Sequence, residues 1–283
     1  MAWFITEDLA EYHAAAGEFL ASRPVEHTVP LTVAQTLRLR GAAAFGRERP
    51  MFGWWRARDG AVTGAFLHTP PHPVLLTSVP PDVIAPLTET LVAAEHTVAG
   101  VNADAAAAEE FAAEWRRLTG ASWRLEQRHR LYRLRELIPP SPAPAGAARV
   151  AGRADRDLLL AWYEAFVQEA GQGPGDLAAA VDDRLAYGGL TLWEVAGERV
   201  SLAGVSRQVA GVTRVAPVYT PPEGRGRGFG GAATAEVSRA ALAGGAREVV
   251  LFTDLANPTS NALYQRLGYR PVEDRVLVSF QEN

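Results

Sequence analysis

Two amino acids are absent from the chain, cysteine and lysine. Without cysteine the protein has no disulfide, no thiolate ligand for a metal and no cysteine nucleophile for covalent catalysis. Without lysine it has no Walker A phosphate loop, because that loop requires the residue. Disulfide scaffolds, thiolate metal sites and P-loop nucleotide hydrolysis are therefore excluded.

Long apolar runs and a basic N-terminus are also lacking. No stretch approaches the about 20 apolar residues that a membrane helix needs. Residues 1–8 contain Glu7 and Asp8 and no basic residue, whereas a signal peptide begins with positive charge. We expect a cytoplasmic protein with no membrane partner. A net charge of −4 argues against nucleic-acid binding, although Arg225 and Arg227 form a local basic patch.

The chain is long enough for two domains and contains a proline-rich segment near its middle. Its 283 residues suffice for two domains of about 150 residues each. Prolines recur at positions 139, 140, 142 and 144, and such sequence favours an extended linker over helix or sheet. We expect one domain over residues 1–138, a linker over 139–148 and a second domain over 149–283.

The same order of elements is predicted on both sides of this linker. Hydrophobic periodicity predicts a hairpin, a third strand, a helix, a short strand, a second helix and a last strand. In the first half these are 51–58 with 61–68, 74–79, 82–95, 97–101, 105–118 and 123–134. In the second half they are 192–195 with 200–205, 212–219, 229–242, 248–253, 258–267 and 276–280. We interpret the two halves as two copies of one α/β unit. The alternative is that two unrelated α/β segments share this order of elements by chance.

A glycine-rich segment joins the third strand of the second half to the helix that follows. After residues 212–219 and Thr220–Glu223 the sequence is Gly-Arg-Gly-Arg-Gly-Phe-Gly-Gly, residues 224–231. Glycines let a ligand approach the backbone, and the N–H groups of a helix's first turn have no partner within the helix. Both features favour the binding of a phosphate.

Two motifs fit these glycines. Gly226, Gly228 and Gly231 match the dinucleotide pattern G-x-G-x-x-G, but that motif turns directly from a strand into a helix within an early βαβ unit. Here Thr220–Glu223 intervenes, and an antiparallel hairpin is predicted upstream. Arg225, Gly228 and Gly230 instead fill R-x-x-G-x-G, which resembles the pyrophosphate loop of the GNAT superfamily of acyl-CoA-dependent N-acetyltransferases.

A second motif lies downstream, over residues 257–269. Asn257 is predicted to cap a helix and Pro258 to occupy its first position. Helical spacing separates Leu263 and Leu267 from a polar face made by Asn257, Ser260, Asn261 and Tyr264. In the family that the chain resembles, an asparagine here contacts the pantetheine arm, and a tyrosine on this helix protonates the departing thiolate. The two motifs together cover about residues 212–269 in the family's order.

The resemblance implies a fold and a reaction. The fold class is α/β, with two GNAT-like domains, each a mixed, mostly antiparallel twisted sheet flanked by helices. The reaction is direct transfer of an acetyl or short acyl group from acetyl-CoA to a small-molecule or peptide amine, without a metal ion. Tyr264 is the implied catalytic acid. The implied cofactor-binding residues are Val218, Tyr219, Thr220, Arg225, Gly226, Arg227, Gly228, Phe229, Gly230, Gly231, Asn257, Ser260 and Asn261.

The first half lacks these motifs. After Pro80-Pro81 its residues 82–86 contain no glycine and no arginine, so its helix start is not expected to bind pyrophosphate. We interpret this half as a degenerate acetyltransferase domain, kept for packing or for substrate selection.

Several alternatives stay open at the level of sequence. Trp162, Glu169 and Tyr187 are candidates for an acceptor pocket, although aromatic residues at helical spacing more often belong to a core. Asp254, Glu169 or a group from the other half is a candidate general base. A catalytically silent acyl-CoA-binding regulator is a second function, and a nicotinamide-dependent oxidoreductase using Glu248 or Asp254 is a third.

Overall fold

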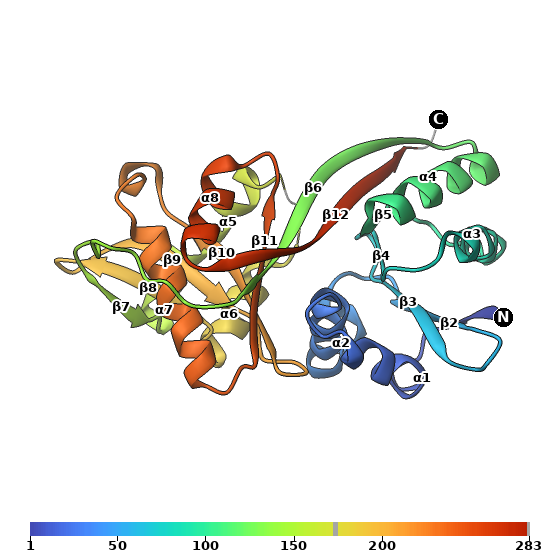
Figure 1. The fold of residues 1–283 in the computed structure, drawn as a ribbon, viewed down its shortest axis with the longest axis horizontal. Helices are drawn as coiled ribbons and strands as arrows, with labels where there is room; N and C mark the ends of the chain where they lie inside the picture. The colour runs from blue at the N-terminus through green and yellow to red at the C-terminus, as the bar shows by residue number, and fades with distance from the viewer. Residues whose placement is uncertain (172–174, 282–283) are drawn as a thin grey trace. The chain divides into compact units, whose positions relative to one another are not determined.

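The computed structural model describes residues 1–171 and 175–281. The sequence also predicts a break between two helices at the glycine-rich residues 171–175, of which 172–174 lie outside the described residues. The chain forms two compact units (Figure 1). Unit 1 comprises Met1–Arg130, Asp254–Ala256 and Glu273–Asn283, and unit 2 comprises Leu131–Thr253 and Asn257–Val272.

Unit 1 is a mixed sheet with helices on both faces. Its strand order is β1-β2-β3-β4-β5-β12-β6, with a parallel β4–β5 pair and antiparallel pairs at β1–β2, β2–β3, β3–β4 and β5–β12. The elements are β1 (Ala2–Thr6), α1 (Leu9–Ser22), α2 (Thr28–Arg40), η1 (Ala42–Ala44), β2 (Met51–Arg56), β3 (Val62–His68), β4 (Val74–Leu76), η2 (Pro81–Val83), α3 (Ile84–Ala93), β5 (Gly100–Asp104), α4 (Ala105–Thr119) and β6 (Ser122–Leu134).

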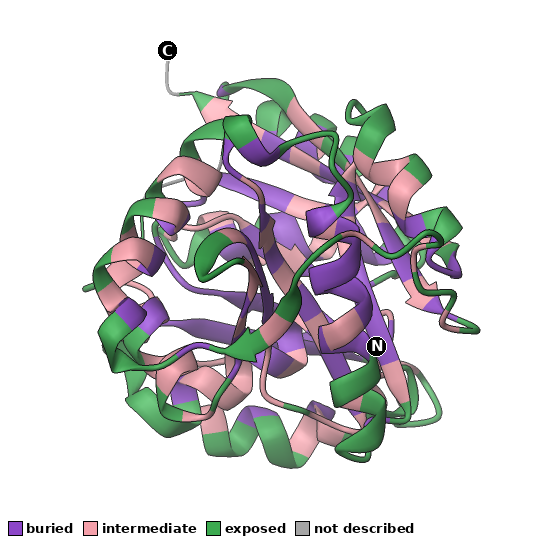
Figure 2. Cartoon of the chain, turned by 90° about the vertical axis from the view of Figure 1, so that its left-hand side faces the viewer, coloured by how far each residue is buried: buried purple, intermediate pink, exposed green. Residues whose placement is uncertain are grey.

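The core of unit 1 has two layers because neighbouring strand residues point to opposite faces. Phe66 packs with residues of α3 and α4, and the adjacent Leu67 packs with residues of α1 and α2. Figure 2 shows the general result, with central strands mostly buried and outer helix turns mostly exposed. The predicted hairpin and helices are present in this unit, and Gly120 is the C-cap of α4.

Unit 2 repeats this plan. Its strand order is β12-β6-β11-β10-β9-β8-β7, with β10–β11 parallel. Leu202 packs under α5 and α6, and the adjacent Ala203 packs under α7 and α8. The elements are β7 (Ala147–Val150), η3 (Arg153–Asp155), α5 (Arg156–Glu169), α6 (Leu177–Ala186), β8 (Leu190–Val195), β9 (Glu198–Val205), β10 (Val212–Tyr219), η4 (Pro222–Gly224), α7 (Phe229–Ala243), β11 (Glu248–Asp254), α8 (Pro258–Arg266) and β12 (Tyr269–Gln281).

Two long strands contribute to both units. Residues 122–130 of β6 and 273–281 of β12 belong to unit 1, and the remaining residues of each strand belong to unit 2. In unit 1, β12 pairs with β5 from Arg275 opposite Asp104 to Ser279 opposite Gly100. The sequence placed residues 273–283 in the second domain, because local periodicity does not reveal the partner of a strand distant in the chain.

The predicted fold class, a mixed and mostly antiparallel sheet flanked by helices, is confirmed. Several boundaries differ from the prediction; for example, the last strand, predicted at 276–280, is β12 and begins at Tyr269. The strand predicted at 97–101 is β5, residues 100–104, whose last residue also caps α4 because Asp104 Oδ1 accepts the Ala107 N–H at 3.0 Å. Residues 147 and 148 of the predicted linker already belong to β7, which pairs with β8. Among the described residues no helix is long and apolar enough to cross a bilayer.

A buried histidine makes unit 1 sensitive to acid. His68 is fully buried at the end of β3, with the backbone of His72 beside its ring. The His96 ring lies 5.5 Å away, measured between ring centroids. Burial, reinforced by His96, lowers the pKa of His68 to about 4. The folded protein therefore holds this imidazole neutral.

We predict that the protein loses stability as the pH falls below 6.5 toward 4. The pKa of His68 is lower in the folded protein than in the unfolded chain, so above pH 6.5 protonation of His68 costs no stability. As the pH falls from 6.5 toward 4, the unfolded chain binds a proton that the folded protein does not, and the free energy of unfolding decreases. Once His68 is protonated in both states, the free energy of unfolding is about 3 kcal/mol lower than at neutral pH, given a pKa shift of this size. Urea unfolding across this pH range measures the effect. His68→Leu should flatten the profile relative to exposed His13→Leu, and equal profiles for the two variants would contradict the assignment.

Candidate functional site

The parallel pair β10–β11 parts half-way along. Val212 lies opposite Glu248, and the pairing ends with Val215 opposite Leu251. β10 continues to Tyr219 and β11 to Asp254, with no paired residues beyond that point in these fully described strands. On its other edge β10 shifts register against β9 between Val215 and Val218. The backbone of β10 after Val215 is therefore left without a strand partner on the β11 side.

The glycine-rich loop follows this free backbone directly. Gly226 and Gly228 have φ angles of +75° and +83°, which favour glycine, and Gly228 is the N-cap of α7. A Cβ on Gly226 would meet no described atom within 4 Å, and a Cβ on Gly228 only Pro144 at 3.8 Å. The first-turn amides of α7, on Phe229, Gly230 and Gly231, are donors without helical acceptors. Together these features can hold an anion.

Short contacts hold the end of β10 against α7. A Cβ on Gly230 would lie 3.1 Å from Thr220 Oγ1, so glycine permits the close approach. The Thr220 and Ser201 hydroxyl oxygens are 2.8 Å apart, and Ser201 Oγ donates to the carbonyl of Tyr219 at 3.0 Å. The structure thus brings together two groups of predicted cofactor residues, Val218 to Thr220 and the loop glycines.

The two loop arginines differ in their partners. Arg225 Nη2 donates to both carboxylate oxygens of Glu169 at 2.7 Å, and Arg225 Nε donates to the Thr220 carbonyl at 2.9 Å. This ion pair is half-exposed and raises the pKa of Arg225. The guanidinium carbon of Arg227 lies 4.8 Å from the centroid of the Phe229 ring, and no described carboxylate forms an ion pair with Arg227. Arg227 is therefore the loop cation that remains available to a ligand.

The polar face of α8 is fixed by a residue that the sequence did not single out. Asn257 caps the helix as predicted, with its Oδ1 accepting the Ser260 N–H at 3.0 Å. Asn261 Oδ1 accepts from the hydroxyl of buried Tyr132 at 2.9 Å, and Gln265 Nε2 donates to the same hydroxyl at 3.1 Å. Tyr132 lies on β6, in the other half of the sequence, and only the strand pairing reveals its role.

Tyr264 is more buried than the sequence predicts. It is 8% exposed and belongs to the core beneath α7, with its ring edge-on to Tyr269 at 6.1 Å between centroids. Burial raises the pKa of Tyr264 to about 12, above the usual value near 10 for a phenol. Because burial disfavours the phenolate, the Tyr264 hydroxyl stays protonated at neutral pH and remains a hydrogen-bond donor.

The candidate bases have identified partners. Both oxygens of Glu169 accept from Arg225, as described above, and Asp254 Oδ1 accepts the Ala256 N–H at 2.8 Å. The carboxylate of Glu248 pairs with Arg133 at 2.9 Å. Glu248 is thus engaged within the sheet, which removes support for a ribose-binding acid there.

Of the acceptor-pocket candidates, Trp162 and Tyr187 both pack against other side chains. Trp162 meets the Tyr219 ring at 6.0 Å between centroids. The Tyr187 hydroxyl donates to the carbonyl of Val205 at 2.7 Å, so the ring is anchored to the sheet. Both side chains are half-buried.

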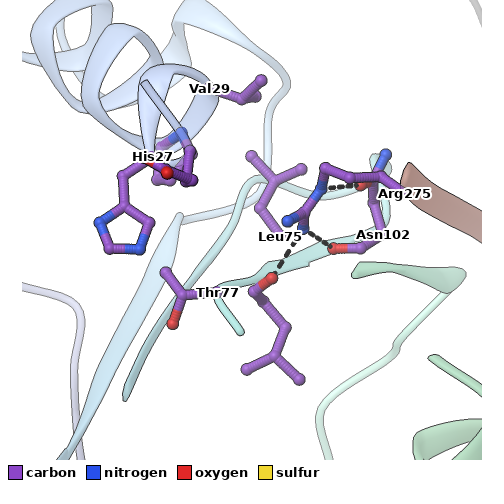
Figure 3. Close-up of a pocket in the computed structure, with 9 residues that line it drawn as sticks. His27, Val29, Leu75, Thr77, Asn102 and Arg275 are labelled. Carbon is purple, nitrogen blue, oxygen red and sulfur yellow. Dashed lines mark hydrogen bonds between the residues drawn. The ribbon is translucent and has the colours of Figure 1, made fainter. Parts of the chain in front are cut away.

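In unit 1 the corresponding strand gap is filled. The parallel pairing of β4 and β5 ends at Leu75 opposite Asn102. There the guanidinium of Arg275 donates to the carbonyls of Leu76 at 2.7 Å and Asn102 at 2.8 Å, and to Asn102 Oδ1 at 3.0 Å (Figure 3). The cavity beside these groups holds about 10 Å³, the space of a single water molecule. Arg275 therefore donates hydrogen bonds to carbonyls at the strand gap of unit 1. At the corresponding gap of unit 2 the backbone of β10 has no strand partner on the β11 side.

The match to known proteins agrees with this geometry. Residues 156–269 match the model of the acetyltransferase (GNAT) family. No curated protein matches the chain.

Solved structures share the fold of the whole chain. A Drosophila protein has a TM-score of 0.70 at 14% identity, covering 99% of this chain and 98% of that chain. A GNAT-family acetyltransferase from Colwellia psychrerythraea has a TM-score of 0.60 at 11% identity, covering 100% of each. A tandem GNAT protein from the clavulanic acid biosynthesis pathway has a TM-score of 0.59 at 13% identity, covering 99% and 98%. Identities this low show the fold alone.

We predict that Arg275→Met destabilises unit 1 by roughly 3 kcal/mol, because two buried carbonyls lose their donors at about 1–3 kcal/mol each. Urea unfolding measures the loss. Arg124→Met, on the exposed part of β6, removes an arginine without exposing a buried carbonyl and is the control. Equal stability of the two variants would show that the guanidinium does not hold the strand gap together.

Proposed function

We propose that unit 2, whose residues 156–269 match the model of the GNAT acetyltransferase family, transfers an acetyl or other short acyl group from acyl-CoA to an amine. The observation that carries the proposal is the parting of β10 from β11 directly before an open helix N-terminus. A long, thin ligand with amides at one end and a pyrophosphate at the other fits this arrangement.

The binding roles follow from the position of each group. The free backbone at Val218 and Thr220 would pair with the amides of the pantetheine arm. The amides of Phe229, Gly230 and Gly231 would receive the pyrophosphate, because they are unpartnered donors at the positive end of the α7 dipole. Arg227 would add charge there, and Arg225 would keep the loop in place through Glu169 and the Thr220 carbonyl. Asn257, Ser260 and Asn261 would line the α8 side.

The chemical step requires two proton movements. The neutral amine nitrogen attacks the thioester carbonyl carbon and forms the carbon–nitrogen bond, and its extra proton passes to solvent water. The carbon–sulfur bond breaks as the thiolate leaves. Tyr264 is the donor that we assign to the leaving sulfur. Complete transfer from a phenol of pKa about 12 to a thiolate of pKa about 8.5 costs about 5 kcal/mol. Tyr264 therefore acts best by donating a hydrogen bond that strengthens as charge develops on sulfur.

We expect acetyl-CoA to stabilise the protein against heat. A ligand at about a hundred times its dissociation constant adds about 2.7 kcal/mol, which raises the melting midpoint by several degrees. NAD should leave the melting curve unchanged. Differential scanning calorimetry with each ligand makes the comparison, and an unchanged midpoint with saturating acetyl-CoA would refute the proposal.

A pair of glycine variants locates the site. Gly228→Ala should weaken acetyl-CoA binding by ~10-fold or more, because a methyl group enters the space beside the α7 amides. Gly197→Ala, in the β8–β9 turn, imposes a similar strain at a φ of +85° with no described atom within 4 Å. Its affinity should stay unchanged. Equal affinities of the two variants would place the cofactor elsewhere.

We predict that Tyr264→Phe lowers turnover by ~100-fold while acetyl-CoA binding persists. The variant keeps the ring in the core but removes the donor to sulfur. Tyr269→Phe is the matched control, since Tyr269 is an equally buried neighbour whose hydroxyl lies 2.7 Å from Ser238 Oγ. Release of free CoA thiol measures turnover. If Tyr264→Phe turns over at the wild-type rate while the chemical step is rate-limiting, Tyr264 is not the donor to sulfur. If the unmodified protein binds CoA but releases no thiol with any amine, it is a catalytically silent regulator.

A further inference from the structure

Three arginines gather around two tyrosines beneath α6. Arg184 lies on α6, Arg207 in the turn after β9 and Arg214 on β10. The guanidinium carbon of Arg184 is 5.8 Å from the centroid of the Tyr163 ring, and that of Arg207 is 4.1 Å from the centroid of the Tyr187 ring. We call these five side chains the arginine cluster.

The arginine cluster lies beside the strand gap of unit 2. Val215 is the last residue of β10 that pairs with β11, and it packs in the core beneath α7 and α8. Its neighbour Arg214 therefore points to the opposite face of the sheet, toward α5 and α6. A molecule bound among these arginines would lie on the α5 and α6 face of β10, next to the residue where the pairing with β11 ends.

Polar groups of the cluster are buried without partners. Tyr163 is 5% exposed, and its hydroxyl has no hydrogen-bond partner among the described residues. The same holds for the Nε atoms of Arg184 and Arg207. A buried donor without an acceptor destabilises the fold, so three of them in one place indicate an acceptor supplied from outside the chain.

Cations outnumber carboxylates among the charged side chains that act on Tyr187. The charged side chains that act on Tyr187 are Arg184, Arg207, Arg214 and a single carboxylate, Asp183. That carboxylate is already paired with Arg207 at 2.9 Å. Burial and the nearby Arg184 lower the pKa of Arg214 to about 10, which is the mark of cations held close together in a desolvated place. An anion bound here would relieve the repulsion.

We propose that the arginine cluster binds an anionic group of the acceptor, so that the amine acetylated by this protein also carries a carboxylate or a phosphate. The inference rests on the proposed function of unit 2. Guanidinium groups donate two parallel hydrogen bonds to such a group, and a phenol hydroxyl adds a third. The side chain of Arg207 is 37% exposed, so the cluster can be reached from solvent. The anionic group would orient the amine toward the thioester at the strand gap.

The first experiment compares matched acceptors in the presence of acetyl-CoA, with thiol release as the readout. Each amino acid is tested beside its carboxamide, which keeps the amine and side chain but removes the charge, and phosphoethanolamine is tested beside ethanolamine. The proposal predicts turnover with members that carry an anion and at least ~10-fold lower kcat/KM for their neutral counterparts. Preference for the amino acids or for the phosphate distinguishes the two anions.

The second experiment uses variants of the cluster. Tyr163→Phe removes a hydroxyl that has no partner in the free protein, so its melting midpoint should be unchanged or higher, while KM for the anionic acceptor rises. Arg184→Gln should raise this KM by ~10-fold or more without changing acetyl-CoA affinity. Arg156→Gln is the control, because Arg156 forms an exposed ion pair with Asp182 of the same helix pair.

The outcomes separate this inference from the function on which it rests. Failure of acetyl-CoA to bind would refute the proposed function. Binding of acetyl-CoA with equal or better turnover of neutral amines, or with no turnover of any anionic amine, would overturn the anionic-acceptor proposal alone. Loss of melting temperature in Tyr163→Phe with an unchanged KM would show that the hydroxyl is only structural.

Discussion

Both units are built around a parallel strand pair that cannot remain paired along its whole length. In unit 2, β10 separates from β11 after Val215, and the glycine loop keeps the space beyond it open. In unit 1, β4 separates from β5 after Leu75, and the guanidinium of Arg275 takes the free carbonyls. Unpaired backbone must find partners. In unit 1 the chain itself supplies them through Arg275, and in unit 2 we propose that a ligand does.

The source of Arg275 explains how this difference arises. The residue lies on β12, whose second part completes the sheet of unit 1 beside β5, while its first part belongs to unit 2. The last strand of the chain thus supplies the residue that fills the strand gap of unit 1, while the strand gap of unit 2 stays open. The proposed roles of the two units, structural support and acyl transfer, follow from this division.

Local signals predicted much of this structure. The glycine loop, the Asn257 cap and the bounds of β10 depend on neighbours in sequence, so periodicity and cap chemistry suffice for them. Tyr132, Arg275 and the burial of Tyr264 depend on strands paired across long separations, which a single sequence does not encode locally. The Arg225 to Glu169 ion pair is missed for the same reason, since it joins α5 to a loop far along the chain.

The number of CoA molecules bound per chain tests the central claim most directly, because the claim is that one strand gap is open and the other is filled. Isothermal titration calorimetry of the full chain with CoA should give one site, and Gly228→Ala should abolish or weaken that single site. Two sites per chain, or one site that survives unchanged in Gly228→Ala, would contradict the account.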